Sequence, residues 1–85
     1  MIFSQQIRAA RMLLGWNQDD LSARAGVGIA TIKRMEGNPG PVSGTTDTLW
    51  KVQRALEEGG VIFIDSDHTG GPGVRLAEPY RPKSH

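Results

Sequence analysis

The feature that most constrains this chain is a pair of short helical segments separated by a turn with two glycines. The first segment begins at Asn17 and carries Leu21 and Ala25 on one face. The stretch Gly26-Val27-Gly28 ends it after about two helical turns. A second apolar-periodic segment, residues 29–36, follows at once. The sequence therefore predicts a helix-turn-helix over residues 17–36.

Two further amphipathic helices flank this pair. The spacing of apolar residues predicts one helix over residues 4–14 and another over residues 46–58. Ser4 is the expected N-cap of the first, and Thr45 or Thr46 of the second. Glycines follow both segments and should end them. The side chains expected to face inward are Phe3, Ile7, Ala10 and Leu14 in the first, and Leu49, Val52 and Leu56 in the second.

The last third of the chain has a different character. Residues 61–64 are β-branched or aromatic and predict a strand, and residues 74–76 predict a return strand that would complete a hairpin. The intervening residues favour a loop, and those from Ala77 onward favour an extended or mobile tail. A lone hairpin is marginal in water, so the strand must pack on the fourth helix or pair with the same strand of a second subunit. We favour the second arrangement.

Composition excludes several classes of protein. The 85 residues contain no cysteine, which excludes a disulfide framework, a thiolate zinc site and a cysteine nucleophile. The first residues do not read as a signal peptide, and no apolar stretch is long enough for a membrane span. The net charge is only +1, although the basic residues exceed the acidic ones by two within residues 1–38. A phosphate-binding surface would therefore lie in the first half.

The outer face of segment 29–36 is suited to contact duplex DNA. With Ile32 and Met35 turned inward, small residues and cations are left to point outward. Arg34 has the reach and geometry to bind guanine or a phosphate, and an α-helix fits the major groove. Apolar contact with thymine methyl groups is expected from Ile29 and Ala30. Gln18, at the start of the preceding helix, is expected to bind a phosphate together with the helix amides.

Arg11 and Glu36 border the apolar faces of the first and third helices. Both charged groups should therefore approach the same small core, where an unpaired charge is costly. The sequence predicts that the two side chains form an ion pair. Such a pair would fix the orientation of the third helix.

The chain resembles the XRE, or Cro/C1-type, helix-turn-helix family over about residues 4–58. The stretches that carry the resemblance are IRAAR at 7–11, NQDDLSARAGV at 17–27, TIKRMEG at 31–37 and TLWKV at 48–52. The resemblance implies a mainly α, four-helix lambda-repressor-like domain, followed here by a short β-hairpin or strand. It also implies a dimeric DNA-binding regulator of pseudo-palindromic operators. Two departures are Gly28, where Ser or Thr is usual, and a strand in place of a fifth helix.

Together these arguments predict a DNA-binding unit at residues 1–60 and a C-terminal element at 61–85 that serves in dimerisation. The expected function is sequence-specific binding of double-stranded DNA by a homodimer, as a repressor with residues 29–36 in the major groove. We expect a cytoplasmic protein of bacterial or phage origin, with no enzymatic activity, no cofactor, no metal and no membrane association. The residues assigned to DNA contact are Asn17, Gln18, Gly28, Ile29, Ala30, Thr31, Lys33, Arg34 and Asn38.

An alternative function stays open, in which an antitoxin-like chain binds a protein partner through residues 61–85 and uses DNA binding for autoregulation. Other candidate sites have simpler interpretations. The glycine-rich run 70–73 is interpreted as a turn rather than a phosphate loop, because no Lys-Ser/Thr or helix follows it. The remaining polar and aromatic candidates are interpreted as turn residues (Asp65, Asp67, His68), solvated residues (Arg8, Arg24) and residues in or at the edge of the core (Trp16, Trp50).

Overall fold

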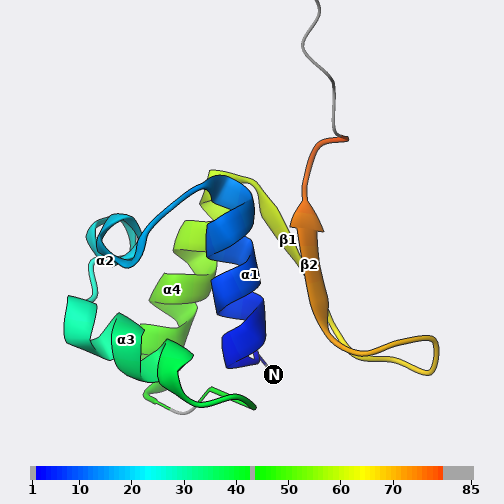
Figure 1. The fold of residues 1–85 in the computed structure, drawn as a ribbon, viewed down its shortest axis with the longest axis horizontal. Coiled ribbons are helices and arrows are strands. Elements are labelled where there is room, and N and C mark those ends of the chain that lie inside the picture. Colours follow the sequence, from blue (N-terminus) through cyan, green and yellow to red (C-terminus); the bar gives the residue numbers. More distant parts are fainter. Residues whose placement is uncertain (1, 43, 80–85) are drawn as a thin grey trace, which may run out of the picture.

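Four helices and a C-terminal hairpin make up the part of the chain that the computed structural model describes, residues 2–42 and 44–79. The elements, in order, are α1 (Ser4–Leu14), α2 (Gln18–Ala25), α3 (Ile29–Gly37), α4 (Thr46–Gly59), β1 (Val61–Ile64) and β2 (Gly73–Leu76). The prediction of a mainly α domain with a short C-terminal hairpin is confirmed. Helices α2 and α3 lie on one side of α1 and α4, and the hairpin lies on the other (Figure 1).

The N-terminus of α1 differs from the prediction. The N-cap is Phe3, not Ser4, and the Gln6 side chain accepts a hydrogen bond of 2.8 Å from the Phe3 amide. Ser4 is instead the first helical residue, with its hydroxyl donating to the Asn38 carbonyl at 2.8 Å. The reason is that Ser4 is buried, with an exposed fraction of 1 %, and its hydroxyl satisfies a long-range acceptor rather than its own helix.

The other helix ends follow the sequence signals. Asn17 and Asp20 cap α2 reciprocally: the Asp20 amide donates to the Asn17 side chain at 2.8 Å, and the Asn17 amide donates to Asp20 Oδ2 at 2.9 Å. Thr45, rather than Thr46, caps α4 by accepting from the Thr48 amide at 3.2 Å. Each cap satisfies an amide that the first turn of a helix leaves free.

The core receives side chains from all four helices and from β1. Helix α1 packs against α3, α4 and both strands, and α2 packs against α3 and α4. The buried apolar residues are Ile7, Ala10, Leu21, Ala25, Ile32, Met35, Val52, Ala55, Leu56 and Val61. The residues that the helical spacing placed inward thus meet in one cluster, with Leu14 and Leu49 only partly buried at its border. Phe3 is the exception, because it lies before the first turn of α1 as the extended N-cap and is not among the side chains packed on this cluster.

The two tryptophans differ in position. Trp16 is half-buried and packs on the core, beside Gly59, where a Cβ atom would come within 2.8 Å of the indole ring. Trp50 is 58 % exposed, so its interpretation as a core or core-edge residue was wrong. The physical reason is the helical period, because Trp50 stands only one residue from the inward-facing Leu49 and is rotated by about 100° from it.

The hairpin packs on the helical body of its own chain. Strands β1 and β2 are antiparallel, with Val61 opposite Leu76 and Phe63 opposite Val74. Both strands pack on α1, and β1 also packs on α4. Gln6 links α1 to the two residues that flank the loop between the strands, since its Nε2 donates to the carbonyls of Ile64 and Gly73 at 3.2 and 3.0 Å.

The structure shows one of the two arrangements that the sequence left open and does not bear on the other. Packing on the fourth helix, which the sequence analysis did not favour, is present, while pairing with a second subunit stays a prediction. The loop between the strands projects away from the helices (Figure 1). Of the predicted tail, residues 80–85 lie outside the described residues. No helix in the described ranges combines the length and the apolar character that a membrane crossing requires.

Candidate nucleic-acid interface

The turn between α2 and α3 is short and is held by three hydrogen bonds with Ser22. Gly26 adopts a left-handed conformation with φ of 68°, which favours glycine. The amides of Gly26 and Val27 both donate to the Ser22 carbonyl, at 3.0 and 3.2 Å, and the Ser22 hydroxyl donates back to the Val27 carbonyl. Gly28 is then the N-cap of α3. These contacts fix the direction in which α3 leaves α2.

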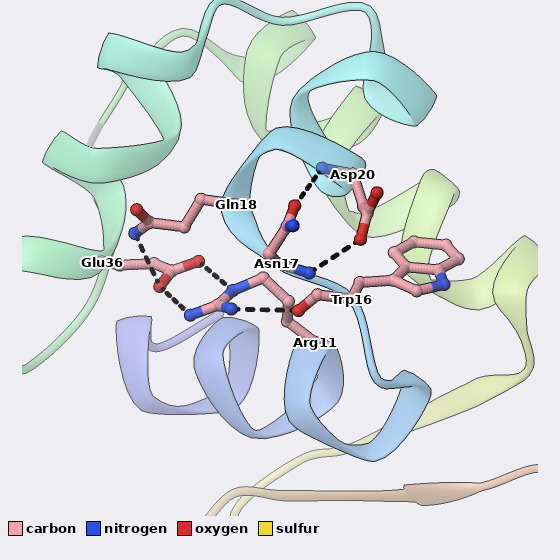
Figure 2. A network of polar contacts seen from close by, with 6 residues as sticks. All are labelled: Arg11, Trp16, Asn17, Gln18, Asp20 and Glu36. Atoms are coloured by element: carbon pink, nitrogen blue, oxygen red, sulfur yellow. Dashed lines mark hydrogen bonds and ion pairs between the residues drawn. The ribbon is translucent and has the colours of Figure 1, made fainter.

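A buried polar network joins α1, α2 and α3 (Figure 2). Arg11 donates to both carboxylate oxygens of Glu36 at 2.9 Å and, through Nη1, to the Trp16 carbonyl at 3.0 Å. The exposed fractions of the Arg11 and Glu36 side chains are 14 % and 4 %. The ion pair that the sequence predicts is therefore present. Its two parallel bonds leave the partners one relative orientation, which ties α3 to α1.

Gln18 takes part in the same network. Its Nε2 donates to Glu36 Oε1 at 3.2 Å, so the first residue of α2 is linked directly to the last turn of α3. This contact was not predicted from the sequence. From the sequence Gln18 was expected to contact DNA alone, although its place at the start of α2, next to the predicted ion pair, was a usable signal. The half-buried Gln18 side chain is thus held at the surface end of a buried network.

The outward face of α3 presents the residues that the sequence assigned to DNA contact. Ala30, Lys33 and Arg34 are exposed, while Ile29 and Thr31 are half-buried. Arg34 Nη2 lies 3.3 Å from Thr31 Oγ1 and donates to it. The face therefore combines two cations, a hydroxyl group and small apolar groups. In a major groove, cationic and hydroxyl groups can hydrogen-bond to base edges, and apolar groups can contact thymine methyl groups.

The N-termini of α2 and α3 differ in charge and capping. At α2 the Asn17 side-chain oxygen is used by the Asp20 amide, and the exposed carboxylates of Asp19 and Asp20 lie in the first turn. At α3 the cap is the exposed Gly28, which has no side chain to accept from the first amides. The start of α3 should consequently bind a phosphate more strongly than the start of α2, because no side chain caps its amides and no carboxylate lies in its first turn.

Other basic and polar candidates fall outside this surface or have another role. The Arg24 guanidinium lies 4.5 Å from the centroid of the Trp16 ring, so it is engaged in a cation–π contact that the sequence did not predict. Arg8 is exposed on α1. Asn38 follows α3 directly as its C-cap and is exposed, at the start of the loop to α4. Of these three residues, only Asn38 continues the surface of α3 along the chain.

The polar residues of the hairpin loop form a turn. Asp67 Oδ1 accepts from the amide and hydroxyl of Thr69 at 2.7 and 2.6 Å and from the Gly70 amide at 3.2 Å. These hydrogen bonds lower the pKa of Asp67 below the usual 3.8, the one from the Thr69 hydroxyl most and the one from the Thr69 amide next. Within the described residues, no three His, Asp or Glu side chains gather in a way that could hold a metal ion.

The turn, the buried network and the open face of α3 define this region as a helix-turn-helix domain. A protein-family model for helix-turn-helix domains, HTH_3, matches residues 7–59. The chain belongs to this family, which comprises DNA-binding transcription regulators of the XRE, or Cro/C1, type. No curated protein sequence matches the chain. The matched region ends before β1, so the hairpin is additional to the family domain.

Proposed function

We propose that this protein binds specific double-stranded DNA as a homodimer and represses transcription by occupying an operator. The observation that carries the proposal is the outward face of α3, held in one orientation by the buried Arg11–Glu36 pair and by Gln18. Pre-ordered contact groups favour binding, because less conformational freedom is lost on association. No chemical step is required, since an occupied operator excludes competing proteins from the promoter.

Sequence would be read from the major groove. The groove is about 12 Å wide and admits one α-helix. Arg34 is the candidate for bidentate contact with guanine, and Ile29 and Ala30 for contact with thymine methyl groups. Lys33, Gln18, Asn38 and the free amides next to Gly28 would bind phosphates, which supply most of the affinity and no direct sequence information. Asn17 would act indirectly, as the cap that orders the start of α2.

The C-terminal hairpin would join two subunits. Strand β1 packs on α4, whereas the far edge of β2 borders a groove that includes Leu13, Val74 and Leu76. Leu13 and Leu76 are both exposed. Unpaired strand edges beside apolar side chains are suited to antiparallel pairing with a second copy. Residues 1–60 would then read DNA and residues 61–85 would set the distance between two recognition helices, about 34 Å for successive half-sites.

A fluorescence-anisotropy titration tests the proposal. One probe carries duplex DNA from upstream of the protein's own gene and the other a scrambled duplex, each at several salt concentrations. We expect tight, salt-sensitive binding with preference for the upstream duplex, and two chains bound per operator. Equal, weak binding to both probes would contradict a specific regulator.

A second candidate function is suggested by the exposed apolar residues outside the helix-turn-helix. Met12 and Leu13 on α1, and Ile62, Ile64 and Leu76 on the hairpin, are exposed large apolar side chains. In an antitoxin-like protein, some of these side chains together with the tail would bind a protein partner, and DNA binding would serve autoregulation. The two candidates differ in the state of the isolated protein. Light scattering that gives a dimer favours the first, and a monomer that dimerises at no attainable concentration favours the second.

A further inference from the structure

The loop after α3 is tied to the N-terminal segment of the chain rather than to itself. Main-chain bonds run in both directions: the Ser4 amide donates to the Gly40 carbonyl and the Val42 amide donates to the Ile2 carbonyl, each at 2.9 Å. Phe3 and Pro41 form an isolated antiparallel bridge between these two bonds. The start of the chain thus lies alongside the loop like a short strand.

Two side chains of the first turn of α1 add to this connection. The Ser4 hydroxyl donates to the Asn38 carbonyl at 2.8 Å, and the Gln5 side chain accepts from the Gly40 amide at 3.1 Å. Ser4 is almost completely buried, whereas Gln5 is exposed. Asn38 and Gly40, the two residues that these side chains hold, belong to the same surface loop.

The loop has few means to order itself. Pro39 and Pro41 have no amide hydrogen, and Gly40 between them has a φ of +116°, a conformation that favours glycine. Within the part of the chain that the structure describes, no hydrogen bond joins two residues of the range 38–42. The amides of Gly40 and Val42 both donate to the N-terminal segment. The shape of the loop is therefore set from outside.

We propose that Ser4 and Gln5 are positioning residues for DNA binding, which hold Asn38 and the loop after α3 in the conformation that meets the DNA backbone. The proposal rests on the DNA-binding function proposed above. A loop fixed before binding loses less conformational freedom when it contacts a phosphate. Because phosphate contacts are independent of DNA sequence, loosening the loop should lower the affinity for all duplexes by the same factor.

The test uses the full chain with the substitutions Gln5→Ala and Ser4→Ala. Gln5→Ala is the safer variant because Gln5 is exposed. Gln53→Ala is its control, since Gln53 is also a helical glutamine and its side chain donates a hydrogen bond to Glu57, within α4. Two quantities are measured: hydrogen exchange of the Gly40 amide by NMR, and DNA affinity for the upstream and scrambled duplexes as a function of salt.

For Gln5→Ala we expect faster exchange of the Gly40 amide and a loss of about two- to fivefold in affinity for both duplexes, with a shallower salt dependence. Ser4→Ala, which removes the buried hydrogen bond to the Asn38 carbonyl, should lower the affinity for both duplexes by about three- to tenfold. Gln53→Ala should change neither quantity. Faster exchange with unchanged DNA affinity would overturn the positioning role, and so would unchanged exchange of the Gly40 amide. If the unmodified protein binds neither duplex, the proposed DNA-binding function itself fails, and the positioning role fails with it.

Discussion

The helix-turn-helix half of the molecule and the C-terminal hairpin differ in how far their polar groups are paired and their apolar side chains buried within the chain. In the helical half, a buried ion pair and a hydrogen-bonded turn fix the position of α3, and a side-chain cap orders the start of α2. In the hairpin, the apolar side chains of Ile62, Ile64 and Leu76 stay exposed, and the described structure pairs each strand with only one other. The polar groups of the first half find their partners within the chain, whereas the second keeps unpaired strand edges and exposed apolar side chains, which is why we propose that it binds a second copy.

The family match divides the molecule at the same place. It covers α1 from Ile7 through α4 and ends at Gly59. The helical half therefore contains the region that matches the family model, and the hairpin lies outside it. If this contrast is correct, substitutions in the two halves should have separable effects on folding, on base preference and on assembly.

The largest effect is expected from Glu36→Ala. This substitution leaves the Arg11 guanidinium largely buried beside the core without its partner, so we expect a loss of about 3–5 kcal/mol in the free energy of unfolding. Denaturation by urea, followed by circular dichroism, measures the change. A matched Glu57→Ala substitution on the exposed face of α4 should lose less than about 0.5 kcal/mol. Equal stability of the two variants would show that the network does not support the helical half.

Arg34→Ala should separate base reading from folding. Arg34 is exposed and its one side-chain hydrogen bond is to Thr31 in its own helix, so stability should change by less than about 0.5 kcal/mol. Discrimination between the upstream and scrambled duplexes should fall by about 1–3 kcal/mol. The measurement is anisotropy with both duplexes at one salt concentration. A loss of affinity that is equal for the two duplexes would assign Arg34 to a phosphate instead.

Leu76→Lys should affect assembly and leave the helical half intact. Leu76 is exposed on β2, and a charge at this edge opposes pairing with a second strand. We expect a monomer by light scattering, a loss of operator affinity of about tenfold or more from the missing second half-site, and little change in thermal stability. Ile64→Lys is the control, because Ile64 lies on the opposite face of the sheet. It tests whether the dimer forms through the β2 edge or through that face. A stable dimer of the Leu76 variant would place the interface elsewhere.

The smallest effect, and an increase, is expected from Asp19→Asn. The exposed Asp19 carboxylate lies in the first turn of α2, beside Gln18, where it repels a phosphate. Removing the charge should strengthen binding of both duplexes by about two- to threefold at low salt, and less at high salt. Asp47→Asn, which is also an exposed first-turn acid but at α4 and paired with Lys51, serves as the comparison. Weaker binding by the Asp19 variant would show that α2 does not face the DNA backbone.

Sequence reasoning succeeded where a pattern is local or where two patterns share a core. The 3.6-residue period located the four helices to within one residue at most ends, and the position of Arg11 and Glu36 beside apolar faces was enough to pair them. It did not succeed for Ser4, whose hydroxyl is directed to a carbonyl 34 residues away. A long-range acceptor leaves no local signal, so the usual capping role was assigned instead.

The hairpin shows the same limit. Strand propensity located residues 61–64 and most of the return strand, but not the surface on which they pack. The Gln6 side chain, which joins α1 to both strands, is polar and occupies a helical position that the spacing alone does not mark as buried. Contacts of this kind depend on the three-dimensional arrangement and appear only in the structure.

The most direct test of the account is an NMR titration of the isotope-labelled protein with duplex DNA from upstream of its gene. We expect amide shifts to concentrate in residues 17–18 and 28–34 and in Asn38, Gly40 and Val42, and the hairpin residues 61–64 and 73–76 to change little. Shifts confined to the hairpin, with α3 unchanged, would contradict the assignment of DNA reading to the helical half.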